Sequence, residues 1–168
     1  MIVAVIFFIL PIGLALAALT DLFTMTIPNR IPAVLLAAFL VLAPFSGLAW
    51  PDIGLSLVAG LVVFAGCFGL FAFNVMGGGD AKLLTAAVVW FGFNHSLLVF
   101  LVAVSFIGGL LTIAILIIRS QSNSVLAMGI PLPASLTTAK KIPYGIAIAI
   151  AGFLTYDQSP IFRLATGT

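Results

Sequence analysis

The sequence contains very few charged residues and no glutamate. Lys, Arg and Asp together make up 6% of the 168 residues, whereas 64% of the residues are hydrophobic. A chain of this composition cannot form a soluble domain, because it lacks the side chains for a polar surface. Its six basic residues are also too few and too scattered to form a nucleic-acid-binding surface, so no nucleic-acid partner is expected.

Cysteine and histidine are equally scarce, with one residue of each, Cys67 and His95. A single cysteine excludes an internal disulfide and a CxxC zinc pair, so Cys67 is expected to pack as a small apolar side chain. It lies in the middle of an apolar run, away from His95, and no serine–histidine pair is evident. The sequence therefore predicts no nucleophilic dyad, no metal site and no cofactor.

Long apolar runs fill most of the chain and predict an all-α integral membrane protein, with one domain over residues 1–168. About six transmembrane helices are expected, at residues 1–20, 31–49, 53–76, 81–93, 97–118 and 143–156. Residues 1–20 are interpreted as a retained span and not as a signal peptide, because no basic segment precedes the apolar run. Asp52 is expected to cap the third helix, and residues 157–168 to form a small tail.

The fourth and sixth predicted helices are short. At about 13 residues each they reach about 20 Å, whereas the hydrocarbon core of a bilayer is about 30 Å thick. If the far end of the fourth helix reaches the opposite face, its first turn lies below the nearer membrane surface. Two short helices that begin on the same side predict a recess that water can enter.

The basic residues predict the orientation in the membrane. With six spans that start outside, five of them fall on one side: Arg30, Lys82, Arg119, Lys140 and Lys141. Arg163 is left on the other side. Because cytoplasmic loops carry an excess of Lys and Arg, the first side is expected to be cytoplasmic and both termini to lie outside.

Asp21 and Asp80 are predicted to lie at similar depth on the cytoplasmic side, on separate helices. Two carboxylates in a partly desolvated recess tend to share one proton. The ionised member can then take a proton from water while the protonated member donates to a peptide carbonyl, which is the chemistry of peptide hydrolysis. Taken singly, Asp80 could instead be a helix N-cap after the glycine run of residues 77–79, and Asp21 could be a solvating residue at the interface.

Three motifs resemble a known family. They are Asp21 followed by Ile27-Pro28-Asn29, then Gly77-x-Gly79-Asp80 with Lys82-Leu83-Leu84, and finally Pro143-Tyr144-Gly145. Together they resemble the type IV prepilin peptidases, the bacterial branch of the GxGD intramembrane aspartic proteases. The small size and the Pro-Tyr-Gly form are most similar to the CpaA/TadV type that serves tight-adherence (Flp) pili.

The resemblance implies an enzyme of the bacterial inner membrane that removes a short basic leader from prepilins at the cytoplasmic face. Asp21 and Asp80 would be the catalytic aspartates, and Gly77 and Gly79 the motif glycines that admit the substrate backbone. The Pro143-Tyr144-Gly145 turn would help to position the substrate. N-methylation of the product is not expected, because the chain lacks the cysteine-containing segment of the larger prepilin peptidases.

Lys82 and the segment of residues 125–136 can each be interpreted in two ways. Lys82 is either a membrane-surface anchor or a residue that tunes the pKa of Asp80. The apolar but broken segment of residues 125–136 is either a plain connector or, with the Pro143 turn, a device that holds the substrate extended.

Two other functional classes also remain open. Paired membrane aspartates occur in proton- or ion-coupled transporters, although here they are expected near one face and the spans show no repeated halves. In a non-catalytic assembly factor the aspartates would only be caps.

Overall fold

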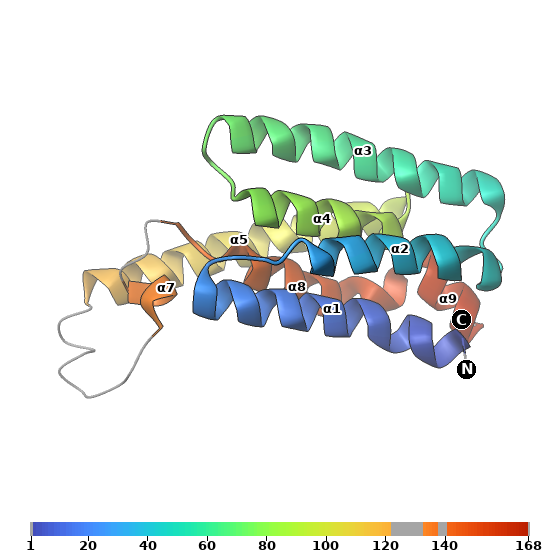
Figure 1. Ribbon diagram of the computed structural model, residues 1–168, viewed down its shortest axis with the longest axis horizontal. Helices are drawn as coiled ribbons and strands as arrows, with labels where there is room; N and C mark the ends of the chain where they lie inside the picture. Colours follow the sequence, from blue (N-terminus) through green and yellow to red (C-terminus); the bar gives the residue numbers. More distant parts are fainter. Residues whose placement is uncertain (1, 122–132, 138–140, 168) are drawn as a thin grey trace.

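A computed structural model describes residues 2–121, 133–137 and 141–167, and every element in these ranges is a helix (Figure 1). The elements are α1 (Ile2–Thr24), α2 (Arg30–Phe45), α3 (Trp50–Ala72), α4 (Gly78–Phe91), α5 (His95–Ser120), α7 (Ala134–Thr137), α8 (Tyr144–Thr155), a 3-10 turn (Tyr156–Gln158) and α9 (Pro160–Thr166).

Three helices are long and apolar enough to cross a membrane. Among the described residues these segments are Val3–Thr24, Trp50–Ala72 and His95–Ser120. The helices α2, α4 and α8 are shorter, with 16, 14 and 12 residues. The prediction of a helical membrane protein is confirmed, and so are the short fourth and sixth helices. These lengths do not show the predicted count of six spans, because only three of the described helices have full spanning length.

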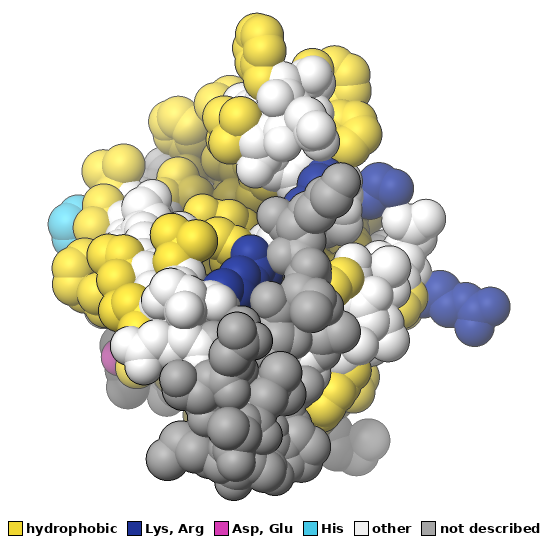
Figure 2. All heavy atoms as spheres, turned by 90° about the vertical axis from the view of Figure 1, so that its left-hand side faces the viewer, with side chains coloured by type: hydrophobic (Ala, Val, Ile, Leu, Met, Phe, Trp, Pro, Cys, Tyr) yellow, Lys and Arg dark blue, Asp and Glu magenta, His cyan; other side chains and the backbone are white. Residues whose placement is uncertain are grey.

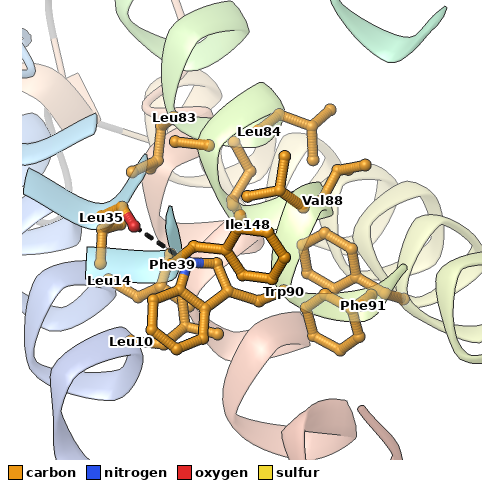
Figure 3. Packing of buried hydrophobic residues seen from close by; sticks show 14 of the residues in the cluster. Leu10, Leu14, Leu35, Phe39, Leu83, Leu84, Val88, Trp90, Phe91 and Ile148 are labelled. Atoms are coloured by element: carbon orange, nitrogen blue, oxygen red, sulfur yellow. Dashed lines mark hydrogen bonds between the residues drawn. The ribbon is translucent and has the colours of Figure 1, made fainter. Parts of the chain in front are cut away.

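The centre of the bundle is α4, which lies between α3 and α2 and also contacts α5, α8 and α9 (Figure 1). Its buried Trp90 donates a hydrogen bond from Nε1 to the Leu35 carbonyl at 3.2 Å and meets the Phe39 ring edge-on (Figure 3). The next residue, Phe91, stacks on Phe100 of α5 with ring centroids 4.2 Å apart. A buried indole that keeps a hydrogen-bond partner anchors α4 to α2 without leaving a polar group unpaired.

The short helix α8 packs between α1 and α5, and small residues allow this close approach. A side chain at Gly152 would collide with Leu14 of α1. After α8, the Tyr156 hydroxyl donates a 2.6 Å hydrogen bond to the Ile6 carbonyl. The C-terminal residues are therefore part of the bundle. The predicted small tail in fact contains α9, whose first residues include the fully buried Ile161.

The first two helices end at other residues than predicted. The first helix continues through Asp21 to Thr24, because the Thr20 hydroxyl bonds back to the Ala17 carbonyl and the polar residues do not interrupt the helix. The second helix ends at Phe45 rather than at residue 49, where Ser46 and the left-handed Gly47 (φ +88°) follow.

The third helix also departs from the predictions at both ends. It begins at Trp50 with Pro51 in its first turn, so Asp52 lies inside that turn and does not cap it. It ends at Ala72, not at residue 76, with Asn74 in a left-handed conformation. It contacts chiefly α4. Of its glycines, Gly60 lies against α4, where a Cβ would come within 2.9 Å of the Val89 side chain, whereas no described atom lies within 4 Å of a Cβ placed on Gly54, Gly66 or Gly69.

Candidate active site

Figure 1 shows that α1 ends, and α2, α4 and α8 begin, at the same end of the bundle. A pocket of about 490 Å³ opens there. We call it the acidic pocket, since both Asp21 and Asp80 line it. The other lining residues are Met25, Thr26, Ile27, Asn29, Gly77, Gly78, Gly79, Lys141 and Ile142. Three separate segments of the chain, residues 21–29, 77–80 and 141–142, therefore meet around the two carboxylates.

Asp21 lies in the last turn of α1 and is 5% exposed. Its Oδ2 accepts a 2.8 Å hydrogen bond from the backbone N–H of Gly145, the second residue of α8. The first N–H groups of a helix have no partner within the helix and carry its positive partial charge, so this end suits a carboxylate. The N-terminus of α8 thus holds Asp21 in place.

Asp80 lies in the first turn of α4, three residues after the N-cap residue Gly77, and is 7% exposed. Its carboxylate folds back to the Gly77 backbone, in the manner of the acidic residue of a capping box. A side chain at Gly77 would place its Cβ 2.7 Å from Asp80 Oδ2, which excludes any residue but glycine without a shift. The other oxygen, Oδ1, is buried and has no hydrogen-bond partner among the described residues.

The two carboxylates are close enough to act on one another. The amide of Gly145 interacts with Asp80 as well as with Asp21, so it lies between the two acids. The charge of Asp21 repels an ionised Asp80, and the ammonium group of Lys141 attracts it. Figure 2 shows this end of the molecule, where Lys and Arg side chains gather.

Gly79 and Gly145 are both positions where the backbone of one segment comes close to another. A Cβ at Gly79 would lie 3.1 Å from the Ile27 side chain, and a Cβ at Gly145 would lie 3.1 Å from the same side chain and 2.8 Å from Asp21 Oδ2. Ile27, in the segment between α1 and α2, is thus wedged between α4 and α8. Glycine at these two positions lets three segments converge on one point.

Lys82 does not line the acidic pocket. Its Nζ donates a 2.9 Å hydrogen bond to Oδ1 of Asn29, the N-cap residue of α2. This exposed bond ties α4 to the start of α2. Asn29 itself does line the pocket, so the bond stands at the pocket's edge.

The structure separates the three residues of the Pro143-Tyr144-Gly145 motif. Gly145 contacts Asp21, whereas Tyr144 points to α5, where its ring packs against Gly108 and its hydroxyl lies 3.3 Å from that of Thr112. Pro143 is buried at the start of α8, and neither it nor Tyr144 lines the acidic pocket. Of the segment 125–136, residues 125–132 lie outside the described residues, so its expected role is a matter for experiment.

The sequence analysis missed a wall of the pocket that Arg119 holds in place. The Arg119 guanidinium donates hydrogen bonds of 2.9 Å and 2.8 Å to the carbonyls of Ser135 and Lys141, and the Ser135 hydroxyl bonds the Leu22 carbonyl in α1. Lys141 and the following Ile142 then line the acidic pocket. The signal available in the sequence was the basic pair Lys140-Lys141, which Ile142 separates from the Pro-Tyr-Gly motif.

No group of three His, Cys, Asp or Glu side chains within residues 2–121, 133–137 and 141–167 could hold a metal ion. The polar groups in and beside the pocket include two carboxylates, one ammonium group and backbone amides at two helix N-termini. Such a set can bind and polarise a peptide carbonyl and activate water.

The fold and the pocket define a helical membrane protein with a pair of buried aspartates at one end of the bundle. The sequence profile of the type IV leader peptidase family matches residues 8–113 of the chain, and the chain belongs to this family. The matched region contains Asp21, Asp80 and the glycine run between α3 and α4, and it ends before α8. No curated protein and no solved structure matches the chain. Membership confirms the resemblance seen in the sequence and implies peptidase activity at the level of the family.

Proposed function

We propose that the protein is an intramembrane aspartic endopeptidase that removes the basic leader of type IV prepilins. The observation that carries the proposal is the meeting of Asp21 and Asp80, from separate helices, in one pocket beside the Gly145 amide. Family membership supports a leader peptidase, and the small size and Pro-Tyr-Gly form favour Flp-type prepilins as substrates.

The two aspartates take different roles in this proposal. The Gly145 amide donates to Asp21, and a donated hydrogen bond stabilises an ionised carboxylate. Asp80 is also reached by the Gly77 and Gly145 amides, so its buried oxygen without a partner is what distinguishes the two acids. On this ground Asp21 is assigned as the base that takes a proton from water. Asp80 keeps a buried oxygen without a partner, which costs less on a neutral carboxyl group, so Asp80 holds the proton and donates it to the scissile carbonyl.

The position of the pocket fits a substrate that lies partly in the membrane. A prepilin has an apolar helix in the bilayer and a basic leader in the cytoplasm, so the bond to be cut lies at the membrane surface. Among the described residues, Arg30, Lys82, Arg119 and Lys141 lie on elements at the pocket end, and Arg163 lies in α9 near the opposite end. The excess of basic residues supports a cytoplasmic pocket in the bacterial inner membrane, with both termini outside.

The proposal is tested by co-expression of the chain with an Flp-type prepilin, followed by the mobility shift that accompanies leader removal. Asp21→Asn and Asp80→Asn should each slow processing by roughly 1,000-fold or more. Losses on this order are seen when a catalytic group is removed from an enzyme. Membrane insertion and thermal stability in detergent should stay close to those of the wild type, because Asn preserves the size of Asp.

The chain provides matched controls in its other two acids, Asp52 and Asp157, which are exposed and lie outside the acidic pocket. Asp52→Asn and Asp157→Asn should process the prepilin at the wild-type rate. Processing that persists in both Asp21→Asn and Asp80→Asn would rule out the aspartic mechanism. Loss of processing in all four variants would indicate a general structural effect instead.

A further inference from the structure

A second pocket, which is apolar and has a volume of about 340 Å³, lies at the surface of the bundle between α2, α3 and α4. We call it the α2–α4 groove. Ala33 and Leu36 of α2 form one wall, Phe64 of α3 the other, and Thr85 and Ala86 of α4 the floor. The groove lies where α2 and α3 contact each other little while both pack against α4.

The groove joins the acidic pocket. Asn29 lines both cavities, and its hydrogen bond with Lys82 marks the junction. Along α2 the groove extends from Asn29 to Leu36, seven residues or about 10 Å, which corresponds to two turns of an α-helix. A chain that leaves the groove at Asn29 enters the pocket that holds both carboxylates.

We propose that the α2–α4 groove binds the first two turns of the substrate's apolar helix. This inference rests on the proposed function and extends it to the part of the substrate that follows the cut. The small, exposed Ala33 allows a second helix to approach closely, which is how helices associate in a bilayer, and the buried Ala86 adds no bulk to the floor of the groove. A free lipid chain could also fill an apolar groove, but only a polypeptide continues from the groove into the acidic pocket.

The junction also suits the change in the substrate from helix to extended chain. Just before its helix a substrate must unwind to expose the scissile bond, and its carbonyls then lose their helical partners. Lys82 carries three N–H donors, of which one is bound to Asn29. In this proposal one of the others binds a carbonyl of the unwound segment. Lys82 is thus a positioning residue that bonds the substrate at the boundary of the two cavities.

A second apolar groove on α2 serves as a control. It is similar in size, about 350 Å³, and is lined by Val34, Ala37 and other residues of α1 and α2, but it shares no lining residue with the acidic pocket. Ala33 and Ala37 are both exposed, lie one turn apart on the same helix and line different grooves. Substitutions at these two alanines therefore compare the two grooves, because any general effect on α2 is the same for both.

The first experiment fills each groove with a phenyl ring. Ala33→Phe should slow processing of a co-expressed prepilin at least tenfold, whereas Ala37→Phe should leave the rate within twofold of the wild type. Both variants should insert normally, because both side chains face outward. Equal rates for Ala33→Phe and Ala37→Phe would overturn the inference.

The second experiment detects the contact without cleavage. A cysteine replaces Ala33 or Ala37 in a chain that also carries Asp80→Asn and Cys67→Ala, and a prepilin carries one cysteine in the first two turns of its apolar helix. Disulfide formation should occur from position 33 and stay at background from position 37. Equal yields, or none from position 33, would overturn the groove assignment. The Asp21→Asn and Asp80→Asn processing results stand independently, so failure of the groove and failure of the peptidase mechanism are distinguishable.

Discussion

Replacing Gly145 by alanine should disable the acidic pocket while the bundle stays assembled. A Cβ at this position lies 2.8 Å from Asp21 Oδ2, about 0.6 Å inside ordinary contact, which begins at 3.4 Å. It also lies 3.1 Å from Asp21 Cβ and 3.1 Å from Ile27 Cδ1, so the methyl group is confined on two sides. Either the Asp21 carboxylate or the start of α8 must move.

The cost can be estimated for both stability and activity. One methyl group forced into a packed site destabilises a protein by about 1–3 kcal/mol. A displacement of about 1 Å in a catalytic group lowers activity about 100-fold, so a shift of about 0.6 Å should lower prepilin processing about 10- to 100-fold. The measurements are the processing rate after co-expression and the thermal unfolding temperature in detergent.

Gly69→Ala is the matched control for this prediction. Gly69 is also helical, but no described atom lies within 4 Å of a Cβ placed there. Alanine in a helix is favoured over glycine by up to about 1 kcal/mol, so this variant should be at least as stable as the wild type and equally active. If folded Gly145→Ala processed prepilin as fast as Gly69→Ala, the assigned role of the Gly145 amide would be refuted.

Two further predictions follow from the same structure. The processing rate should have a bell-shaped pH dependence, because acid protonates Asp21, the proposed base, and alkali removes the proton from Asp80, the proposed acid. A rate that rises to a plateau without an alkaline fall would contradict the role proposed for Asp80. Trp90→Phe should lower the stability in detergent by about 1–3 kcal/mol, since it loses the 3.2 Å hydrogen bond to the Leu35 carbonyl and part of a buried ring, and an unchanged unfolding temperature would show that this contact contributes nothing.

The general position of the site could be anticipated from the sequence. Asp21 follows the first apolar run and Asp80 precedes the fourth, so any arrangement that alternates helix direction brings both to one end. The short fourth and sixth helices could be anticipated in the same way. Gly92 and Asn94 end the fourth helix, and Pro143 sets the start of the sixth. These features depend only on the order of apolar and polar residues along the chain.

Contacts between distant segments could not be anticipated in this way. Nothing in the sequence indicates that Tyr144 turns to Gly108, because this depends on how α8 packs against α5. The bond between Lys82 and Asn29 and the clamp from Arg119 to the Lys141 carbonyl likewise join residues far apart in the chain. Their side chains are compatible with many partners, and only the packing of the helices selects one.

Two local sequence signals favour helix boundaries that differ from the predicted ones. Pro51 favours the first turn of a helix, which places the start of α3 before Asp52 and removes its role as a cap. Ser159 and Pro160 followed by Gly167 are the usual start and stop signals of a helix, and they bound α9. The polar character of residues 157–168 concealed this helix.

The late position of α8 in the chain has a consequence for biogenesis. Both aspartates enter the membrane with α1 and α4, but the amide that orients Asp21 belongs to residue 145 and is synthesised after α5 and the long segment that follows it. A nascent chain halted before that point carries the acids without their organising partner. On the proposed mechanism, proteolytic competence therefore requires synthesis through residue 145, after both acids are already in place.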